Sequence, residues 1–250
     1  MLLILFSCSN DETQISEPVV DDLYFPAIDS DQWETITPEE LNWDSIGIGN
    51  LYDFLELNNT RAFIVLKNGK IVLENYWGNN IQNTAPFDKN SNWYWASAGK
   101  TLTAFLVGIA QDNGLLSIED SSSIFLGNGW TSLEESQESL IKIKHHLTMT
   151  TGLDYLVDNL NCTTPNCLTY KNTPGTNWFY HNATYTLLKD VIENSSETTY
   201  NDFTNQKVKM KIGMGGSWIQ SNYNNIYWST ALDMARFGLL ILNEGVWDNQ

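Results

Sequence analysis

The sequence predicts a mixed α/β (α+β) fold in which helices pack on an antiparallel sheet. Runs of β-prone residues at 62–66 and 71–76 flank the pair Asn68-Gly69, and an Asn-Gly pair between such runs is a strong hairpin signal. Patterns of apolar residues at helical spacing follow later in the chain, at 97–113, 183–193 and 231–243. Strands near the start of a domain with helices behind them indicate a sheet covered by helices.

Each of these helices has its own local signal. Ahead of the hairpin, 41–57 carries apolar residues at helix-like intervals. The stretch 97–113 is apolar almost all round, so we expect a buried helix there. The last helix, 231–243, opens with a capping-box pattern, Thr230 followed by Asp233.

Length and composition predict one globular domain. The chain has 250 residues, of which 42% are hydrophobic, and this is enough to bury a sizeable core. Residues 9–32 are acidic, contain Pro18 and Pro26, and follow no helical or strand period, which is typical of a flexible tether. We therefore expect the folded domain to occupy residues 33–250.

The start of the chain is similar to the end of a bacterial lipoprotein signal. An apolar run, too short to span a bilayer, ends with the small residue Ser7 before Cys8. In such signals the cysteine is lipidated and becomes the mature N-terminus. The pattern predicts a signal remnant at 1–8 and a lipid anchor on Cys8 that holds the protein to the cell envelope, in the periplasm or at the outer membrane. The alternative is a hydrophobic terminus with an incidental cysteine.

The chain is strongly acidic. Its 30 Asp and Glu residues outnumber 13 Lys and Arg, which gives a formal net charge of −17. No basic stretch is present that could neutralise the phosphates of a nucleic-acid backbone. The composition therefore argues against a nucleic-acid partner.

The other cysteines, Cys162 and Cys167, lie on either side of a short segment that contains Pro165. In an oxidising envelope compartment this spacing favours a disulfide. The alternative is a zinc site that also uses His145 and His146, but the spacing matches no common structural zinc pattern. We therefore expect no metal.

Ser97-Ala98-Gly99-Lys100 is an SxxK tetrad at the start of the predicted buried helix. Three-residue spacing places the two polar side chains on one helix face, so an amine can reach a hydroxyl. Serine is a weak nucleophile and needs an adjacent base, which a lysine in an apolar surrounding can provide. The pattern thus predicts Ser97 as nucleophile and Lys100 as its base.

Ordinary structural roles compete with this interpretation. Ser97 could be a helix N-cap and Lys100 a solvated residue of the first turn. A second SxxK, from Ser139 to Lys142, also occurs, as composition alone would produce. It lies between an acidic stretch and an alternating Ile-Lys run, so we attribute it to chance.

Tyr180-His181-Asn182 forms a YxN triplet later in the chain. The phenol of Tyr180 can transfer a proton, and the amide of Asn182 can orient a substrate. The alternative is a surface tyrosine followed by an asparagine that caps the next helix.

Together these motifs resemble serine β-lactamases and penicillin-binding proteins, in particular the class C branch, whose second motif is YxN. The resemblance extends from about Trp33 to Gln250. It is carried, in the order expected of that family, by 94–100, 114–116, 146–153, 174–182 and 233–238.

The resemblance implies a serine hydrolase. Ser97 would attack the carbonyl of a small-molecule or peptide-like amide or ester, Lys100 and Tyr180 would share the proton transfers, and Asn182 would hold the substrate. Water would then release the acyl group, and no metal or organic cofactor is implied.

The family's third motif, a Lys or His followed by a small residue and Gly on a strand, should come after the last predicted helix. Lys211-Ile212-Gly213 comes before that helix and is therefore rejected as its equivalent. We expect the sequence to be a fragment that lacks this motif and the closing strands. The rival hypothesis is a binding or sensor lipoprotein of the same fold that is non-catalytic or only becomes acylated.

Overall fold

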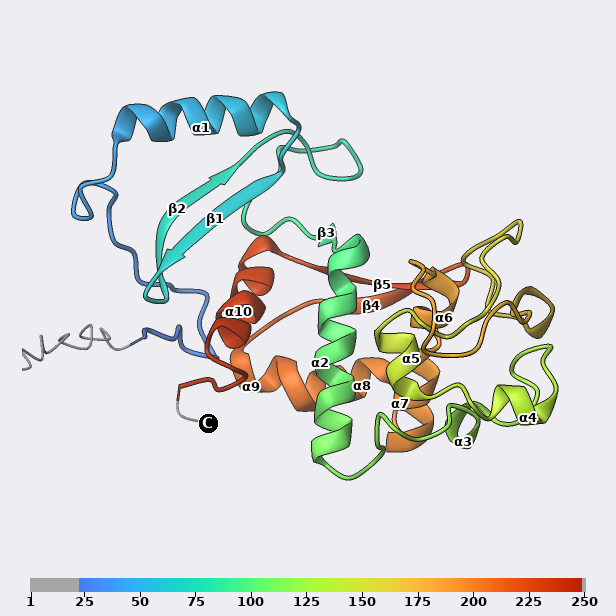
Figure 1. The fold of residues 1–250 in the computed structure, drawn as a ribbon. Helices are drawn as coiled ribbons and strands as arrows, with labels where there is room; N and C mark the ends of the chain where they lie inside the picture. Colours follow the sequence, from blue (N-terminus) through green and yellow to red (C-terminus); the bar gives the residue numbers. More distant parts are fainter. Residues whose placement is uncertain (1–22, 249–250) are drawn as a thin grey trace, which may run out of the picture.

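The computed structural model describes residues 23–248, which form two antiparallel sheets with helices packed around them (Figure 1). The first sheet is the hairpin of β1 (Ala62–Lys67) and β2 (Lys70–Tyr76). Asn68 and Gly69 have φ angles of 49° and 81°, as the tight turn predicted from this pair requires. The mixed α/β fold and the hairpin are therefore confirmed.

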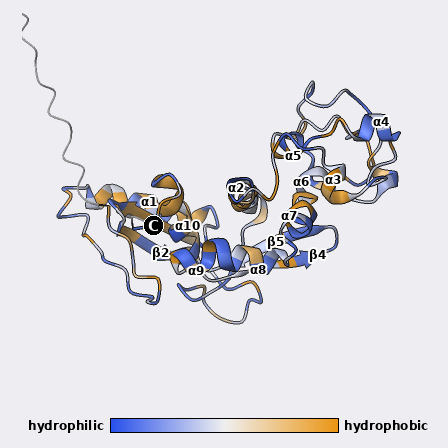
Figure 2. Cartoon of the chain, turned by 90° about the horizontal axis from the view of Figure 1, so that it is seen from below, coloured by the Kyte–Doolittle hydropathy of each residue, from blue (hydrophilic) through white to orange (hydrophobic). Residues whose placement is uncertain are grey.

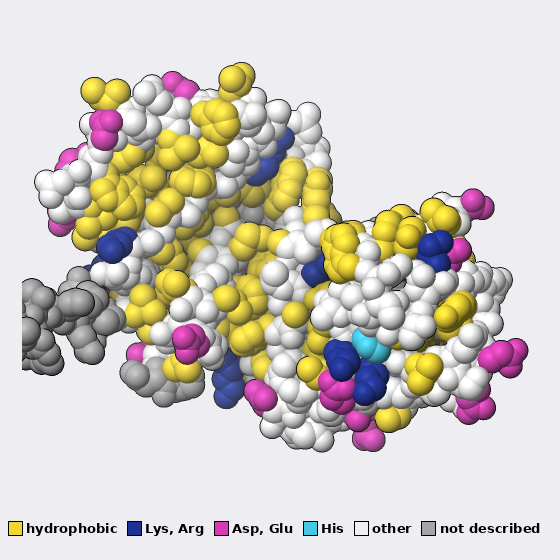
Figure 3. All heavy atoms as spheres, in the orientation of Figure 1, with side chains coloured by type: hydrophobic (Ala, Val, Ile, Leu, Met, Phe, Trp, Pro, Cys, Tyr) yellow, Lys and Arg dark blue, Asp and Glu magenta, His cyan; other side chains and the backbone are white. Residues whose placement is uncertain are grey.

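Helix α1 (Ser45–Leu57) lies beside this hairpin (Figure 1). It begins after Asp44, whose side chain accepts a hydrogen bond from the Ile46 N–H at 3.0 Å, so the helix predicted at 41–57 starts slightly later. None of its residues is buried, and Phe54 and Leu57 are exposed. Figure 3 shows hydrophobic side chains gathered over this part of the molecule.

The second sheet has the order β3-β5-β4. The central strand β5 (Asn224–Ser229) pairs with β4 (Ser217–Ser221) on one side and with the short β3 (Trp93–Tyr94) on the other. The pairing continues past β3, because the Trp95 N–H donates to the Tyr227 carbonyl at 2.8 Å. This strand therefore fixes the chain immediately ahead of the SxxK tetrad.

Helix α2 (Gly99–Asp112) follows a single 3₁₀ turn (Ala96–Ala98). Its buried face packs against α7 (Leu188–Ser196) through residues such as Leu106 and Ala110, and Figure 2 shows it end-on. The expectation of a buried helix holds for one face of α2 only. A narrow face of small residues, Thr101, Ala104 and Gly108, is exposed.

The predicted helix at 183–193 is divided into α6 (Asn182–Thr186) and α7. At the break, the carbonyl of Thr184 accepts a hydrogen bond from Nδ1 of His146 at 2.7 Å. The last predicted helix is α10 (Ala231–Leu242), and its capping box forms as expected between Thr230 and Asp233. The other helical segments are α3 (Ser123–Leu126), α4 (Glu135–Glu138), α5 (Ile143–Leu147), a 3₁₀ turn (Pro165–Cys167), α8 (Tyr200–Thr204), a π-helical turn (Asn205–Lys209) and α9 (Met210–Ile212).

The folded chain begins before the predicted boundary at Trp33. The buried guanidinium of Arg236 donates hydrogen bonds to the carbonyl oxygens of Pro26, Ala27 and Ser30. Leu23, Phe25 and Trp33 pack against the main hydrophobic core. Residues 23–32 are thus part of the domain rather than of the predicted tether, because the buried Arg236 guanidinium donates hydrogen bonds to several of their carbonyl groups.

The predicted signal remnant, its Cys8 and the first part of the tether lie outside the described residues. Between residues 23 and 248, no helix has the length and apolar character needed to cross a membrane.

Candidate active site

Ser97 is held at the junction between sheet and helix. Trp95, just upstream, is buried, and its indole N–H donates to Ser229 Oγ at 2.8 Å. Ala96 then adopts a φ angle of +45°, a left-handed conformation that is unfavourable for a residue with a Cβ. This turn leaves Ser97 exposed at the start of α2, while the chain on both sides of it is fixed.

Three of the predicted site residues lie together. The hydroxyl of Tyr180 donates a hydrogen bond to Ser97 Oγ at 2.6 Å, and Lys100 Nζ lies 3.4 Å from the same oxygen. Ser97 Oγ therefore lies between a phenol from the segment before α6 and an amine from the first turn of α2. The Tyr180 distance is within the reach of direct proton transfer, and the Lys100 distance is slightly longer, as is common in a site without substrate.

Lys100 faces aromatic rings. Its Nζ lies 5.0 Å from the ring centroid of Tyr180 and 5.8 Å from that of Tyr185. It forms no ion pair with a carboxylate anywhere in residues 23–248. The hydroxyl of Tyr185 donates to the Lys100 carbonyl at 2.8 Å, which ties α6 to the start of α2. The Lys100 amine therefore has aromatic and hydroxyl neighbours but no carboxylate partner.

The Tyr180 hydroxyl is more acidic than an ordinary phenol. Partial burial raises its pKa, but the hydrogen bond with Ser97 and the neighbouring Lys100 lower it by more, so the pKa lies below its usual value. A phenol with a lowered pKa exchanges its proton more readily near neutral pH. This suits Tyr180 to proton transfer at Ser97 Oγ.

Asn182 is the first residue of α6, which His181 precedes as N-cap. Its Nδ2 donates to Oδ1 of Asn161 at 3.1 Å. Its own Oδ1 is buried and has no hydrogen-bond partner. Asn182 lines the same cavity as Ser97 and Lys100, so the structure brings all four predicted site residues to one place.

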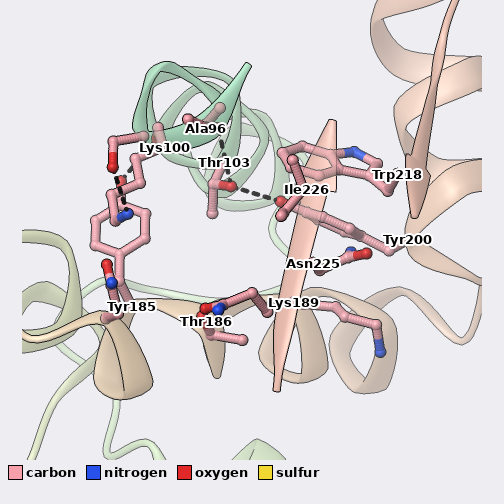
Figure 4. A pocket seen from close by; sticks show the side chains of 14 residues that line it. Ala96, Lys100, Thr103, Tyr185, Thr186, Lys189, Tyr200, Trp218, Asn225 and Ile226 are labelled. Carbon is pink, nitrogen blue, oxygen red and sulfur yellow. Dashed lines mark hydrogen bonds between the residues drawn. The ribbon is translucent and has the colours of Figure 1, made fainter. Parts of the chain in front are cut away.

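This cavity, the Ser97 cavity below, has a volume of about 170 Å³ and is shown in Figure 4. Lys100 and Tyr185 lie at one end, and Trp218, Asn225 and Ile226 lie at the other (Figure 4). Tyr200 lies on the side of Trp218 and donates to Thr103 Oγ1 at 2.8 Å, which links α8 to α2 beside the cavity (Figure 4). Its lining mixes aromatic surface with amide groups, as a site for a small polar ligand requires.

Sequence reasoning missed Tyr185, Tyr200, Trp218 and Asn225. Only Tyr185 carried a usable signal, because it lies three residues after Asn182 on the same short helix. The others come from separate elements that only the tertiary fold brings to the cavity.

The remaining sequence candidates lie elsewhere. In the second SxxK, Ser139 Oγ donates to the Ser136 carbonyl, and Lys142 pairs with Glu119 at 2.8 Å. Cys162 and Cys167 are joined in a disulfide. In the part of the chain that is described, His, Cys, Asp and Glu form no group of three or more able to hold a metal ion.

A family model described as Beta-lactamase matches residues 60–249. The structure of a protein described as a 6-aminohexanoate-dimer hydrolase from Bacillus anthracis is similar, with a TM-score of 0.69 at 16% identity over 92% of this chain and 67% of that chain.

Two further solved structures show the same fold. A penicillin binding protein from Bacillus halodurans has a TM-score of 0.62 at 17% identity over 79% of this chain and 75% of that chain. A protein described as a beta-lactamase from Bacteroides dorei has a TM-score of 0.65 at 20% identity over 83% of this chain and 66% of that chain. The chain thus spans about two thirds of the first and third of these proteins. No curated protein matches.

Proposed function

The chain belongs to the β-lactamase family, and on that premise we propose that it is a serine hydrolase that cleaves an amide or ester bond through an acyl-enzyme on Ser97. One observation carries the proposal. Ser97 Oγ lies 2.6 Å from the Tyr180 hydroxyl and 3.4 Å from Lys100 Nζ, so the oxygen that would attack has two proton-transfer groups within reach.

In the proposed reaction, Lys100 first passes one proton to solvent, so that its neutral amine can act as the base that takes the Ser97 Oγ proton as this oxygen attacks the carbonyl carbon. Tyr180 carries a proton between this pair and the leaving group, so that the C–N or C–O bond breaks with a neutral amine or alcohol departing. A water molecule then attacks the acyl ester and gives up a proton by the same route, which releases the acid and restores Ser97. The start of α2 offers backbone N–H groups to the developing oxyanion.

The Ser97 cavity supports a substrate with polar groups beside the scissile bond. Asn182 and Asn225 supply amide donors and acceptors, and Trp218 and Tyr200 supply apolar surface. One structural neighbour is described as a 6-aminohexanoate-dimer hydrolase, and we include oligoamides with β-lactams, D-peptides and simple esters as candidates. Distinguishing them requires direct assay.

The test is a hydrolysis panel on the full chain. Chromogenic β-lactams, nitrophenyl esters, D-alanyl dipeptides and linear oligoamides are compared for the wild type, Ser97→Ala and Ser139→Ala. The last variant is a matched control, because Ser139 is exposed and begins the second SxxK. We expect turnover of at least one class that Ser97→Ala abolishes and Ser139→Ala preserves.

Other outcomes would decide against the proposal. Turnover that survives in Ser97→Ala would contradict the nucleophile. A wild type that becomes acylated at Ser97 but releases no product would favour the acylation-only sensor instead.

A further inference from the structure

Trp178 lies beside the proposed site and has its indole in solvent. It is 67% exposed, more than any other tryptophan between residues 23 and 248, and it lies two residues before Tyr180. The tryptophans on the sheet side of the site, Trp95 and Trp218, are buried in the main core instead. An indole offers a large planar apolar surface on which other planar groups stack. The surface of Trp178 is therefore free to contact a ligand.

The segment that carries Trp178 is extended, and its rings alternate between two sides. Residues 177–180 contain no helix, turn or bend, and His181 has φ and ψ angles of −118° and 102°. Phe179 and His181 lie on one side, with their ring centroids 6.4 Å apart. Successive side chains of an extended chain point to opposite faces, so Trp178 and Tyr180 share the other side. That is the side on which the Tyr180 hydroxyl meets Ser97 Oγ.

The opposite side of this segment is anchored to the fold. The Phe179 ring stacks on Tyr155 with 3.9 Å between centroids, and the Phe179 N–H donates to the Met149 carbonyl at 3.1 Å. Tyr155 is held in turn by Lys171, whose Nζ lies 4.6 Å from its ring centroid. The backbone of Trp178 is thus fixed in place without a ligand, which lowers the cost of binding one.

Positions 182, 180 and 178 follow one another away from the Ser97 cavity. Asn182 lines the cavity, Tyr180 reaches Ser97 Oγ, and Trp178 lies outside the cavity lining. A substrate that extends from Ser97 past Tyr180 and out of the cavity therefore meets the indole. In the proposed reaction Tyr180 passes the proton to the departing nitrogen or oxygen. The group bonded to that atom is then the part of the substrate nearest to Trp178.

We propose that Trp178 is a specificity-determining residue whose indole forms a wall for the leaving group. The wall favours leaving amines or alcohols that carry an aromatic or other planar apolar group. The inference rests on the proposed hydrolase function. It assigns the indole a binding contact and no part in proton transfer.

Two esters of one acid test the proposal on the full chain, with the acyl group that the hydrolysis panel shows to be cleaved fastest. One is the benzyl ester and the other the methyl ester, so they differ only in the leaving group and give the same acyl-enzyme. Trp178→Ala removes the wall, and Trp178→Phe keeps an aromatic ring. Trp43→Ala is the matched control, because Trp43 is also exposed but lies ahead of α1. Thermal unfolding establishes that each variant is folded.

We expect Trp178→Ala to lower kcat/KM for the benzyl ester about three- to tenfold, the effect of one aromatic contact, and to change that for the methyl ester less than about twofold. Trp178→Phe should keep most of the preference for the benzyl ester, and Trp43→Ala should match the wild type. Decay of the acyl-enzyme, which no longer holds the leaving group, should be equal in Trp178→Ala and the wild type. An unchanged preference, an equal loss for both esters, or a slower decay would overturn the proposal.

A second readout does not depend on turnover. In the Ser97→Ala chain, the indole N–H signal of Trp178 is identified in the NMR spectrum by its absence when Trp178→Phe is added. This signal should shift with N-benzylacetamide and much less with N-methylacetamide. A signal that responds to neither compound, or equally to both, would refute the wall alone. Hydrolysis that survives in Ser97→Ala would instead refute the proposed hydrolase function.

Discussion

Replacing Tyr180 with Phe separates a hydrogen bond from a proton-transfer group. The substitution keeps the ring beside Lys100, 5.0 Å from Nζ, and removes only the hydroxyl that donates to Ser97 Oγ at 2.6 Å. If the hydroxyl only held Ser97 in place, its loss would cost about 1 kcal/mol, a factor of about five in rate. If it carries a proton during acylation, its loss should cost about 10² to 10⁴ in rate. We expect the larger effect.

The measurement is the rate of the acylation burst with a chromogenic ester, followed from neutral to alkaline pH. In the wild type, the rate should change with ionisation of a group whose pKa lies below that of an ordinary phenol, because the hydrogen bond with Ser97 and the charge of Lys100 outweigh the effect of burial at Tyr180. In Tyr180→Phe that dependence should be absent.

Folding serves as the control for this variant. The Tyr180 side chain is 41% exposed, so the substitution should change the free energy of unfolding by no more than about 0.5 kcal/mol. A stable variant whose acylation rate lies within about fivefold of the wild type would refute the proton-transfer role.

Three further predictions concern other residues. Lys100→Arg keeps the charge but cannot give up its proton, so acylation should fall by about 10² or more, and near-normal acylation would refute Lys100 as the base. Burial lowers the pKa of His146 to about 4 from 6.5; between these values the unfolded chain binds the proton that the folded chain excludes. The contribution of His146 to stability should therefore be fully present well above pH 6.5 and fall by about 2 kcal/mol between pH 7 and 5. Urea unfolding of His146→Gln should lack this part of the pH dependence, whereas the parts from His145 and His181, whose pKa values burial also lowers, should remain. Cys8→Ser should release the protein from membranes in cell fractionation; a wild type already free of membrane would contradict the lipid anchor.

Local signals predicted the hairpin and the longer helices, but not the second sheet or most of the short helices. The Asn68-Gly69 turn and the Thr230 to Asp233 capping box depend on a few neighbouring residues, so they can be recognised in the sequence. Where the longer elements begin, end or break depends on contacts with residues that are far away in the sequence. The helix predicted at 183–193 breaks where His146 from α5 takes the Thr184 carbonyl, a contact that no local pattern shows.

The candidate site, too, could be predicted from the sequence only in part. The one-turn spacing of Ser97 and Lys100 follows from helix geometry, but the approach of Tyr180 from another segment was expected only from family resemblance. Residues 23–32 were assigned to the tether because their sequence has no period, and the carbonyl contacts of Arg236 could not be foreseen from composition.

Mass spectrometry of a trapped acyl-enzyme tests the central claim most directly. The full chain is incubated with a slowly released β-lactam or activated ester, quenched in acid and digested, and the added mass is mapped to a residue. We predict one adduct per chain, on the peptide that contains Ser97, and none in Ser97→Ala. An adduct on another residue, or steady hydrolysis by a chain on which no adduct forms under any quench condition, would contradict the account.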